Sequence, residues 1–174
     1  DLEPANRPQL LSALRKLRRR FELVGVRCSN KEVARVAARD RRVDLLSFPL
    51  DPRRRFFDEA EAELASGANC ALEVELMPLL RLGPVRRIRL LARLREEVAL
   101  ARRYGIPVVV SSGADELLLM RRPRELAYLA SALLGLGLEE ALDALSRVPM
   151  GLVERNRAKL DPSFIAPGIR LVKR

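Results

Sequence analysis

The chain has 174 residues, 48% of them hydrophobic, which is enough for one folded domain with a buried core. Lys and Arg number 33 against 23 Asp and Glu, so the formal net charge is +10, and a balance this basic is typical of nucleic-acid binders. The chain contains no histidine, which excludes Ser-His-Asp and Cys-His catalysis, and zinc sites built on histidine, within these residues.

The first predicted element is a helix near the amino end. Its apolar residues recur at helical spacing and form one stripe: Leu10, Leu14, Leu17 and Phe21. The opposite face carries five basic residues: Arg15, Lys16, Arg18, Arg19 and Arg20.

A strand and a second helix follow. The short apolar run within Glu22–Cys28 predicts the strand. Ser29 and Glu32 have the spacing of a capping box, which predicts a helix start directly after that strand. The expected buried face of this helix consists of Val33, Val36 and Ala37.

Three more strands are predicted at Val43–Phe48, Cys70–Leu76 and Ile106–Ser111. The last is almost wholly apolar, as expected of a strand that is buried on both faces. Together with the first strand, they give four strands separated by helices. This alternation predicts an α/β fold of parallel βαβ units.

Two helices separate these strands. The first carries Phe57, Ala60 and Leu64 at helical spacing, and Gly67 is its expected end. The second is long and ends at Gly105. Its apolar positions are Ile88, Leu91, Leu94, Val98 and Ala101.

The last third of the chain is predicted to be helical. Pro123 suits the first position of a helix, and two more helices are expected at Leu138–Val148 and Gly151–Leu160. Asp161 and Pro162 should end the last one. We expect a single domain over residues 1–174, with residues 162–174 as an arm or a terminal strand.

Four strands cannot close an eight-stranded barrel. Either the sheet is open, or further strands precede Asp1. The chain begins with a helix and has Asp rather than Met at its first position, which favours missing upstream strands.

Cys28 and Cys70 lie in predicted strands without a CxxC spacing. Two buried thiols in a reducing compartment are therefore expected, with a disulfide as the alternative. Residues 1–8 resemble no signal peptide, and no apolar run reaches the roughly 18 residues that a membrane span needs. These features predict a cytoplasmic protein that does not bind membranes.

Polar residues follow the predicted strands, at the edge where parallel α/β folds bind ligands. Glu73 and Glu75 should point to one face of their strand, where they either hold Mg²⁺ and act as acid and base, or pair with nearby arginines. Ser111, Ser112 and Gly113 either cradle an anion or cap the following turn. The nucleotide-binding glycine patterns are absent here.

Basic clusters are the stronger signal. They lie in the loop before Phe56, at two predicted helix starts and along the first helix: Arg53, Arg54 and Arg55; Arg86, Arg87 and Arg89; Arg121, Arg122 and Arg124; and Arg15, Lys16, Arg18, Arg19 and Arg20. One such cluster is often only a solvated face. The helix dipole disfavours cations at a helix start, however, so two such starts suggest a partner that supplies negative charge. RNA phosphate is such a partner, and the few aromatic residues favour recognition of structured RNA over base stacking.

Five segments in order and spacing carry a resemblance to a known family: residues 43–48 (VDLLSF), 71–80 (ALEVELMPLL), 108–114 (VVVSSGA), 121–126 (RRPREL) and 149–156 (PMGLVERN). Across roughly residues 20–160 the chain resembles the (β/α)-barrel protein subunit of archaeal and eukaryotic-type ribonuclease P. That family is related to the polymerase and histidinol phosphatase barrel superfamily.

The resemblance implies a TIM-barrel-like fold with mainly parallel strands, incomplete at the N-terminus in this chain. It implies a role in 5′-end maturation of precursor tRNA, in which a catalytic RNA with its Mg²⁺ carries the cleavage. It also implies two partners, the ribonuclease P RNA and a small α/β subunit, the latter in a dimer of heterodimers. The superfamily's metal sites are rich in histidine, and this chain has none.

Our hypothesis is an RNA-organising subunit that has no catalytic residue and binds no metal or cofactor itself. Arg121 and Arg124 match RNA-contact positions of the family. Charge and placement alone add five more candidates: Arg53, Arg54, Arg86, Arg87 and Arg89. The alternatives are a metal-dependent barrel hydrolase that acts alone through Glu73 and Glu75, and a protein-binding scaffold.

Overall fold

The computed structural model describes residues 1–160, 163–166 and 169–172. One parallel sheet contains four strands in chain order: β1 (Gly25–Arg27), β2 (Leu45–Ser47), β3 (Ala71–Glu75) and β4 (Val108–Ser111). Leu2 extends the sheet beyond β1, since its N–H donates to Gly25 O and its carbonyl accepts from the Arg27 N–H. The predicted α/β fold is confirmed, and sequential parallel strands with intervening helices agree with its TIM-barrel-like character.

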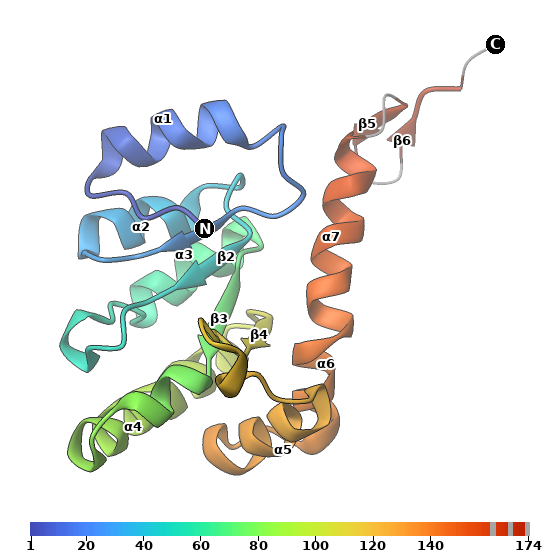
Figure 1. The fold of residues 1–174 in the computed structure, drawn as a ribbon. Coiled ribbons are helices and arrows are strands. Elements are labelled where there is room, and N and C mark those ends of the chain that lie inside the picture. The colour runs from blue at the N-terminus through green and yellow to red at the C-terminus, as the bar shows by residue number, and fades with distance from the viewer. Residues whose placement is uncertain (161–162, 167–168, 173–174) are drawn as a thin grey trace.

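Helices connect the strands and complete the chain (Figure 1). The α-helices are α1 (Arg7–Leu17), α2 (Lys31–Arg39), α3 (Glu59–Ala68), α4 (Pro84–Arg103), α5 (Pro123–Leu134), α6 (Leu138–Leu145) and α7 (Arg147–Leu160). Three short 3₁₀ helices lie in loops: η1 (Pro52–Arg54), η2 (Met77–Arg81) and η3 (Leu117–Leu119).

Alternation along each strand divides the core into two parts. Leu46, Leu72 and Val110 face the main core, which the buried sides of α2, α3 and α4 complete. Leu45, Ala71 and Val109 face the other way and pack with residues of α7, notably Leu152. In Figure 1, α7 accordingly stands apart from α1–α4, with the strands between them. Val108–Val110 are buried throughout, as the apolar run predicted.

Several predicted boundaries were wrong. The first helix ends at Leu17, and Phe21 is 53% exposed rather than part of the buried stripe. The cap of α2 is Asn30, whose side chain accepts the Val33 N–H, and not Ser29. Both residues are good caps, so their order in the sequence could not decide between them.

The next two helices also differ in detail. Gly67 lies inside α3, which ends at Ala68 and is followed by Asn69 in the left-handed conformation with φ 59°. Phe57 is buried but precedes α3, and Ala60 is exposed. In α4, the predicted Leu94, Val98 and Ala101 are buried, but Ile88 is 68% exposed, and Leu90 and Glu97 complete the buried face.

The carboxyl-terminal helices occur where predicted, with Pro123 in the first turn of α5. The last begins at Arg147, four residues before Gly151, and contains Pro149 in its first turn, where proline is tolerated. The predicted stop at Asp161 and Pro162 lies outside the described residues. In the tail, β5 (Phe164–Ala166) pairs antiparallel with β6 (Ile169–Arg170), which agrees with the terminal-strand alternative. Over the described ranges, no helix has the length and apolarity to cross a bilayer.

Candidate nucleic-acid interface

The loop after β2 and the start of α4 meet at one pocket, which we call the α4 pocket. Three of its residues are arginines that were predicted separately: Arg53, Arg86 and Arg89. The cavity measures about 460 Å³ and is completed by Leu50, Asp51, Pro52 and Leu82. The structure thus brings together two clusters that lie more than thirty residues apart in the sequence.

Local structure fixes this geometry. Asp51 caps η1 by accepting the Arg53 N–H at 3.0 Å, so its carboxylate is engaged with backbone. None of the guanidinium groups of Arg53, Arg86 and Arg89 makes a hydrogen bond or ion pair with the described part of the chain. The first turn of α4 contains no acidic residue, and cations there oppose the helix dipole. Three arginines against the single carboxylate of Asp51 therefore leave the pocket with a net positive charge that an anion would stabilise.

Arg54 and Arg87 are held by backbone oxygens instead. Arg54 donates to Ser29 O at 3.1 Å while it remains exposed. Arg87 donates to three carbonyls that close the corner between η2 and α4, those of Leu79, Leu80 and Leu82, at 3.0, 3.2 and 2.8 Å. Only Nη1 of Arg87 is left for another partner.

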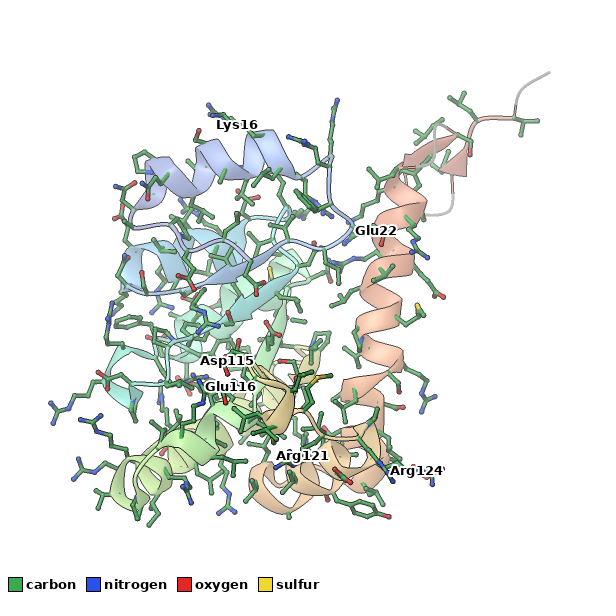
Figure 2. The ribbon with its side chains drawn as sticks, viewed as in Figure 1. Lys16, Glu22, Asp115, Glu116, Arg121 and Arg124 are labelled. Atoms are coloured by element: carbon green, nitrogen blue, oxygen red, sulfur yellow. The ribbon has the colours of Figure 1, made fainter. Side chains whose placement is uncertain are left out.

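Arg121 and Arg124 lie at the start of α5 and do not line the α4 pocket (Figure 2). Nη1 of Arg121 donates to the carbonyls of Leu118 and Met120 at 2.7 and 2.9 Å. Arg124 is exposed and has no partner among the residues described. Of this pair, Arg124 is therefore the one that is free to bind a ligand.

Arg55, the third member of its triplet, is buried. Its Nε and Nη2 donate to the Glu97 carboxylate at 2.9 and 2.6 Å, and Nη1 donates to Phe48 O and Pro49 O. The guanidinium also lies over the Phe48 ring. These contacts attach the loop after β2 to α4 and so position Arg53 beside Arg86. The sequence contained no signal for this pairing, because its partners are 42 residues apart.

Glu73 and Glu75 share a strand face, as predicted, but Glu75 is occupied. Nη2 of Arg27 donates to Oε1 of Glu75 at 2.7 Å, which is the pairing alternative rather than a metal site. Burial raises the pKa of Glu73, opposed by a hydrogen bond from Ser111 and reinforced by Glu75. No cluster of three Asp, Glu or Cys side chains suited to a metal ion occurs where the chain is described.

The geometry of the turn after β4 indicates that this turn stabilises the fold. Ser112 Oγ accepts the Ala114 N–H at 3.3 Å, which agrees with the capping alternative. Gly113 has φ +57°, and a Cβ there would lie 2.7 Å from the Cβ of Glu75, so only glycine fits.

The two cysteines are buried free thiols, as predicted. Burial raises the pKa of Cys70 to about 12 and that of Cys28 well above its usual range, so both thiols are unreactive.

Comparisons with known proteins identify the family and the fold of this chain. A family model described as RNase P subunit p30 matches residues 3–161. The "Ribonuclease P protein component 3" of Methanosarcina acetivorans is 33% identical over 173 residues, which cover 99% of this chain and 71% of the relative. That of Methanothermobacter thermautotrophicus is 31% identical over 92% of this chain and 64% of the relative. A chain in the "cryo-EM structure of archaeal Ribonuclease P with mature tRNA" shares the fold, with TM-score 0.86 at 22% identity over 99% of this chain and 74% of that chain.

Proposed function

The chain belongs to the RNase P subunit p30 family, and we propose that it serves ribonuclease P by binding the catalytic RNA through the α4 pocket. The observation that carries this proposal is the convergence of Arg53, Arg86 and Arg89, without partners in the described structure, from two separate segments. Guanidinium groups suit this task because their planar donors match phosphate oxygens in pairs.

In this proposal the protein neutralises phosphates, so that RNA helices pack closely at lower Mg²⁺ concentration. Cleavage at the 5′ end of precursor tRNA belongs to the RNA and its Mg²⁺, and the chain binds no cofactor of its own. Arg121 and Arg124 add a second contact at the start of α5, with Arg124 as its free donor. Arg54, next to Arg53 in the chain, adds an exposed side chain whose Nη2 is bound to Ser29 O.

The proposal also includes a protein partner and a location. A small α/β subunit of the same enzyme binds this chain in a dimer of heterodimers, as the family resemblance implies. The complex works in the cytoplasm, and the two buried free thiols agree with a reducing compartment.

The test is the variant R53Q/R86Q/R89Q, titrated with transcribed ribonuclease P RNA at several KCl concentrations. If each arginine contacts one duplex phosphate, the slope of log affinity against log salt falls by roughly 2 to 3. The matched control removes three exposed arginines that are each paired with a carboxylate: R102Q/R103Q/R147Q. An equal change in both variants would show a general charge effect and would contradict the proposed site.

A second assay addresses the hydrolase alternative. The purified chain is incubated with precursor tRNA and Mg²⁺, with and without the catalytic RNA. We expect cleavage only when the RNA is present. Substantial cleavage by the protein alone, lost in Glu73→Gln, would establish the alternative.

A further inference from the structure

A second basic groove lies between α1 and α2, and we call it the α1–α2 groove. It measures about 330 Å³ and is lined by Arg7, Leu11, Val36, Arg39, Asp40 and Arg41. Its three arginines come from the start of α1, the end of α2 and the turn that follows. No basic cluster in the sequence predicted it, because Arg7 stands alone and lies far from the other two.

The positive charge of this groove is not compensated within the described residues. Arg7, Arg39 and Arg41 are exposed, and their guanidinium groups have no hydrogen bond or ion pair there. The one carboxylate in the lining, Asp40, is already bound by Arg42, whose N–H, Nε and Nη2 donate to it at 3.0, 2.9 and 2.6 Å. This pairing holds the pKa of Asp40 below its usual range.

Arg35 on the same helix shows the contrast. It lies outside the groove, and both of its terminal nitrogens are bound to carboxylates, Nη2 to Asp58 at 2.6 Å and Nη1 to Glu61 at 2.9 Å. Arg35, which reaches α3, is therefore paired, whereas Arg39, which lines the groove, is not.

Arg39 and Arg41 lie at the opposite end of β2 from the α4 pocket, whereas Arg7 begins α1 beside the carboxyl end of β1, where Asn30 Nδ2 donates to Ala5 O. Arg39 and Arg41 precede β2, whereas Leu50–Arg53 follow it. In a parallel sheet the residues before a strand lie at its amino end and those after it at its carboxyl end, on opposite sides of the sheet's strand ends. A run of phosphates seated in the α4 pocket therefore does not reach Arg39 and Arg41 at the same point.

We propose that the α1–α2 groove is a second phosphate-binding site, which holds a separate segment of the same RNA. The inference rests on the proposed function, since it takes the RNA from there. The ligand is the sugar–phosphate backbone rather than bases, because the lining has no aromatic side chain on which a base could stack. With two such sites, the protein links two RNA segments instead of covering one.

The test compares R7Q/R39Q/R41Q with the triple variant of the α4 pocket, using the full chain and transcribed ribonuclease P RNA. Hydroxyl-radical footprints and the salt dependence of affinity are measured. We expect the salt slope to fall by roughly 2 to 3 if each arginine contacts one duplex phosphate. We also expect protection to be lost at one RNA segment, while the segment protected by the α4 pocket stays protected. Thermal unfolding should be unchanged, because the three side chains have no described partner to lose.

The matched control removes equal charge from exposed residues of α1 and of the turn that follows it: R15Q/K16Q/R19Q. Lys16 projects from α1 into solvent, away from the groove (Figure 2). An unchanged slope, an equal change in the control, or loss of the same nucleotides as in the α4-pocket variant would each overturn the inference. If the α4-pocket variant behaves as expected and the groove variant does not, only the inference fails. If neither variant alters binding, the proposed function fails as well.

Discussion

Two arginine environments lie side by side on the same segments, the loop after β2 and helix α4. Arg55 is 4% exposed in its side chain and fully bound by Glu97 and two carbonyls. Arg53, two residues earlier, is exposed and has no described partner for its guanidinium. A single arginine run in the sequence therefore contains both an arginine that stabilises the fold and one that is open to a ligand. Burial and partners separate the arginines that hold the fold from those that are open to a ligand.

The two environments should respond differently to mutation. A buried ion pair contributes little net stability when intact, but removal of one partner leaves an uncompensated buried charge. An exposed, unpaired arginine contributes almost nothing to the free energy of folding, so its removal should change only the binding of a ligand.

The largest effect is expected for Glu97→Ala. Glu97 is fully buried and binds Arg55, and Arg93 lies 3.4 Å from the same carboxylate. The variant leaves Arg55 without its counter-charge, so the free energy of unfolding should fall by about 3–5 kcal/mol in urea titrations. The control Arg53→Ala should stay within about 0.5 kcal/mol of the wild type. Equal losses in the two variants would show that the division between environments is wrong.

The pH dependence of stability should come next in size. Glu61 is fully buried in α3, with one oxygen bound by Arg35 and the other without a hydrogen bond. Burial raises its pKa to about 7, against the opposing effect of Arg35. The native state therefore binds the proton more tightly than the unfolded chain does. Stability should fall as pH rises from about 4.5 to 7, by on the order of 1–3 kcal/mol.

Glu61→Gln should flatten this decline when unfolding is measured between pH 5 and 8. Glu73, whose pKa is also raised, contributes with the same sign, so part of the slope should remain. Asp40 and Asp58 have lowered pKa values and act at more acidic pH. An unchanged slope in Glu61→Gln would mean that this carboxyl does not take up a proton in the native state near neutral pH.

Much of the fold could be predicted because it depends on local pattern. The four strands were placed by their apolar runs, and Pro123 marked the start of α5 correctly. The predicted apolar stripe from Leu10 to Phe21 was wrong at Phe21, because a contact between distant residues accompanies the end of the helix. Arg18 turns toward the buried carboxylate of Asp44, at 3.3 Å, and the helix ends just before it.

The candidate site was only partly predictable. Charge and position identified Arg53, Arg86 and Arg89, but their convergence depends on packing between distant segments. Sequence gave no means to tell Arg86 from Arg87, because neighbouring residues on a helix point in different directions. Likewise, Asp44 binds Arg155 and Asn156, more than a hundred residues away, in contacts that only the folded chain creates.

Arg86 and Arg87 are neighbours in the chain that differ in environment, since Arg87 is bound to backbone carbonyls and Arg86 lines the α4 pocket. Arg87→Ala removes three hydrogen bonds to carbonyls at a partly exposed corner, so stability should fall by about 1–2 kcal/mol with little change in the salt slope of RNA binding. Arg86→Ala should leave stability unchanged and lower the slope by about 1. Urea unfolding of both variants measures the loss of stability expected only for Arg87→Ala, and RNA titration measures the lower salt slope expected only for Arg86→Ala. Parallel changes in the two variants would contradict it.

The smallest effect is expected at the start of α5, where the two environments differ least. Arg124→Ala should lower the salt slope by at most about 0.9, because one unpaired guanidinium contacts at most one phosphate. Arg121→Ala should change RNA binding less, since its Nη1 is engaged by Leu118 O and Met120 O. The double variant R121A/R124A decides whether this helix start touches RNA at all. If its affinity and slope equal those of the wild type, the α4 pocket must bind the RNA without help from α5.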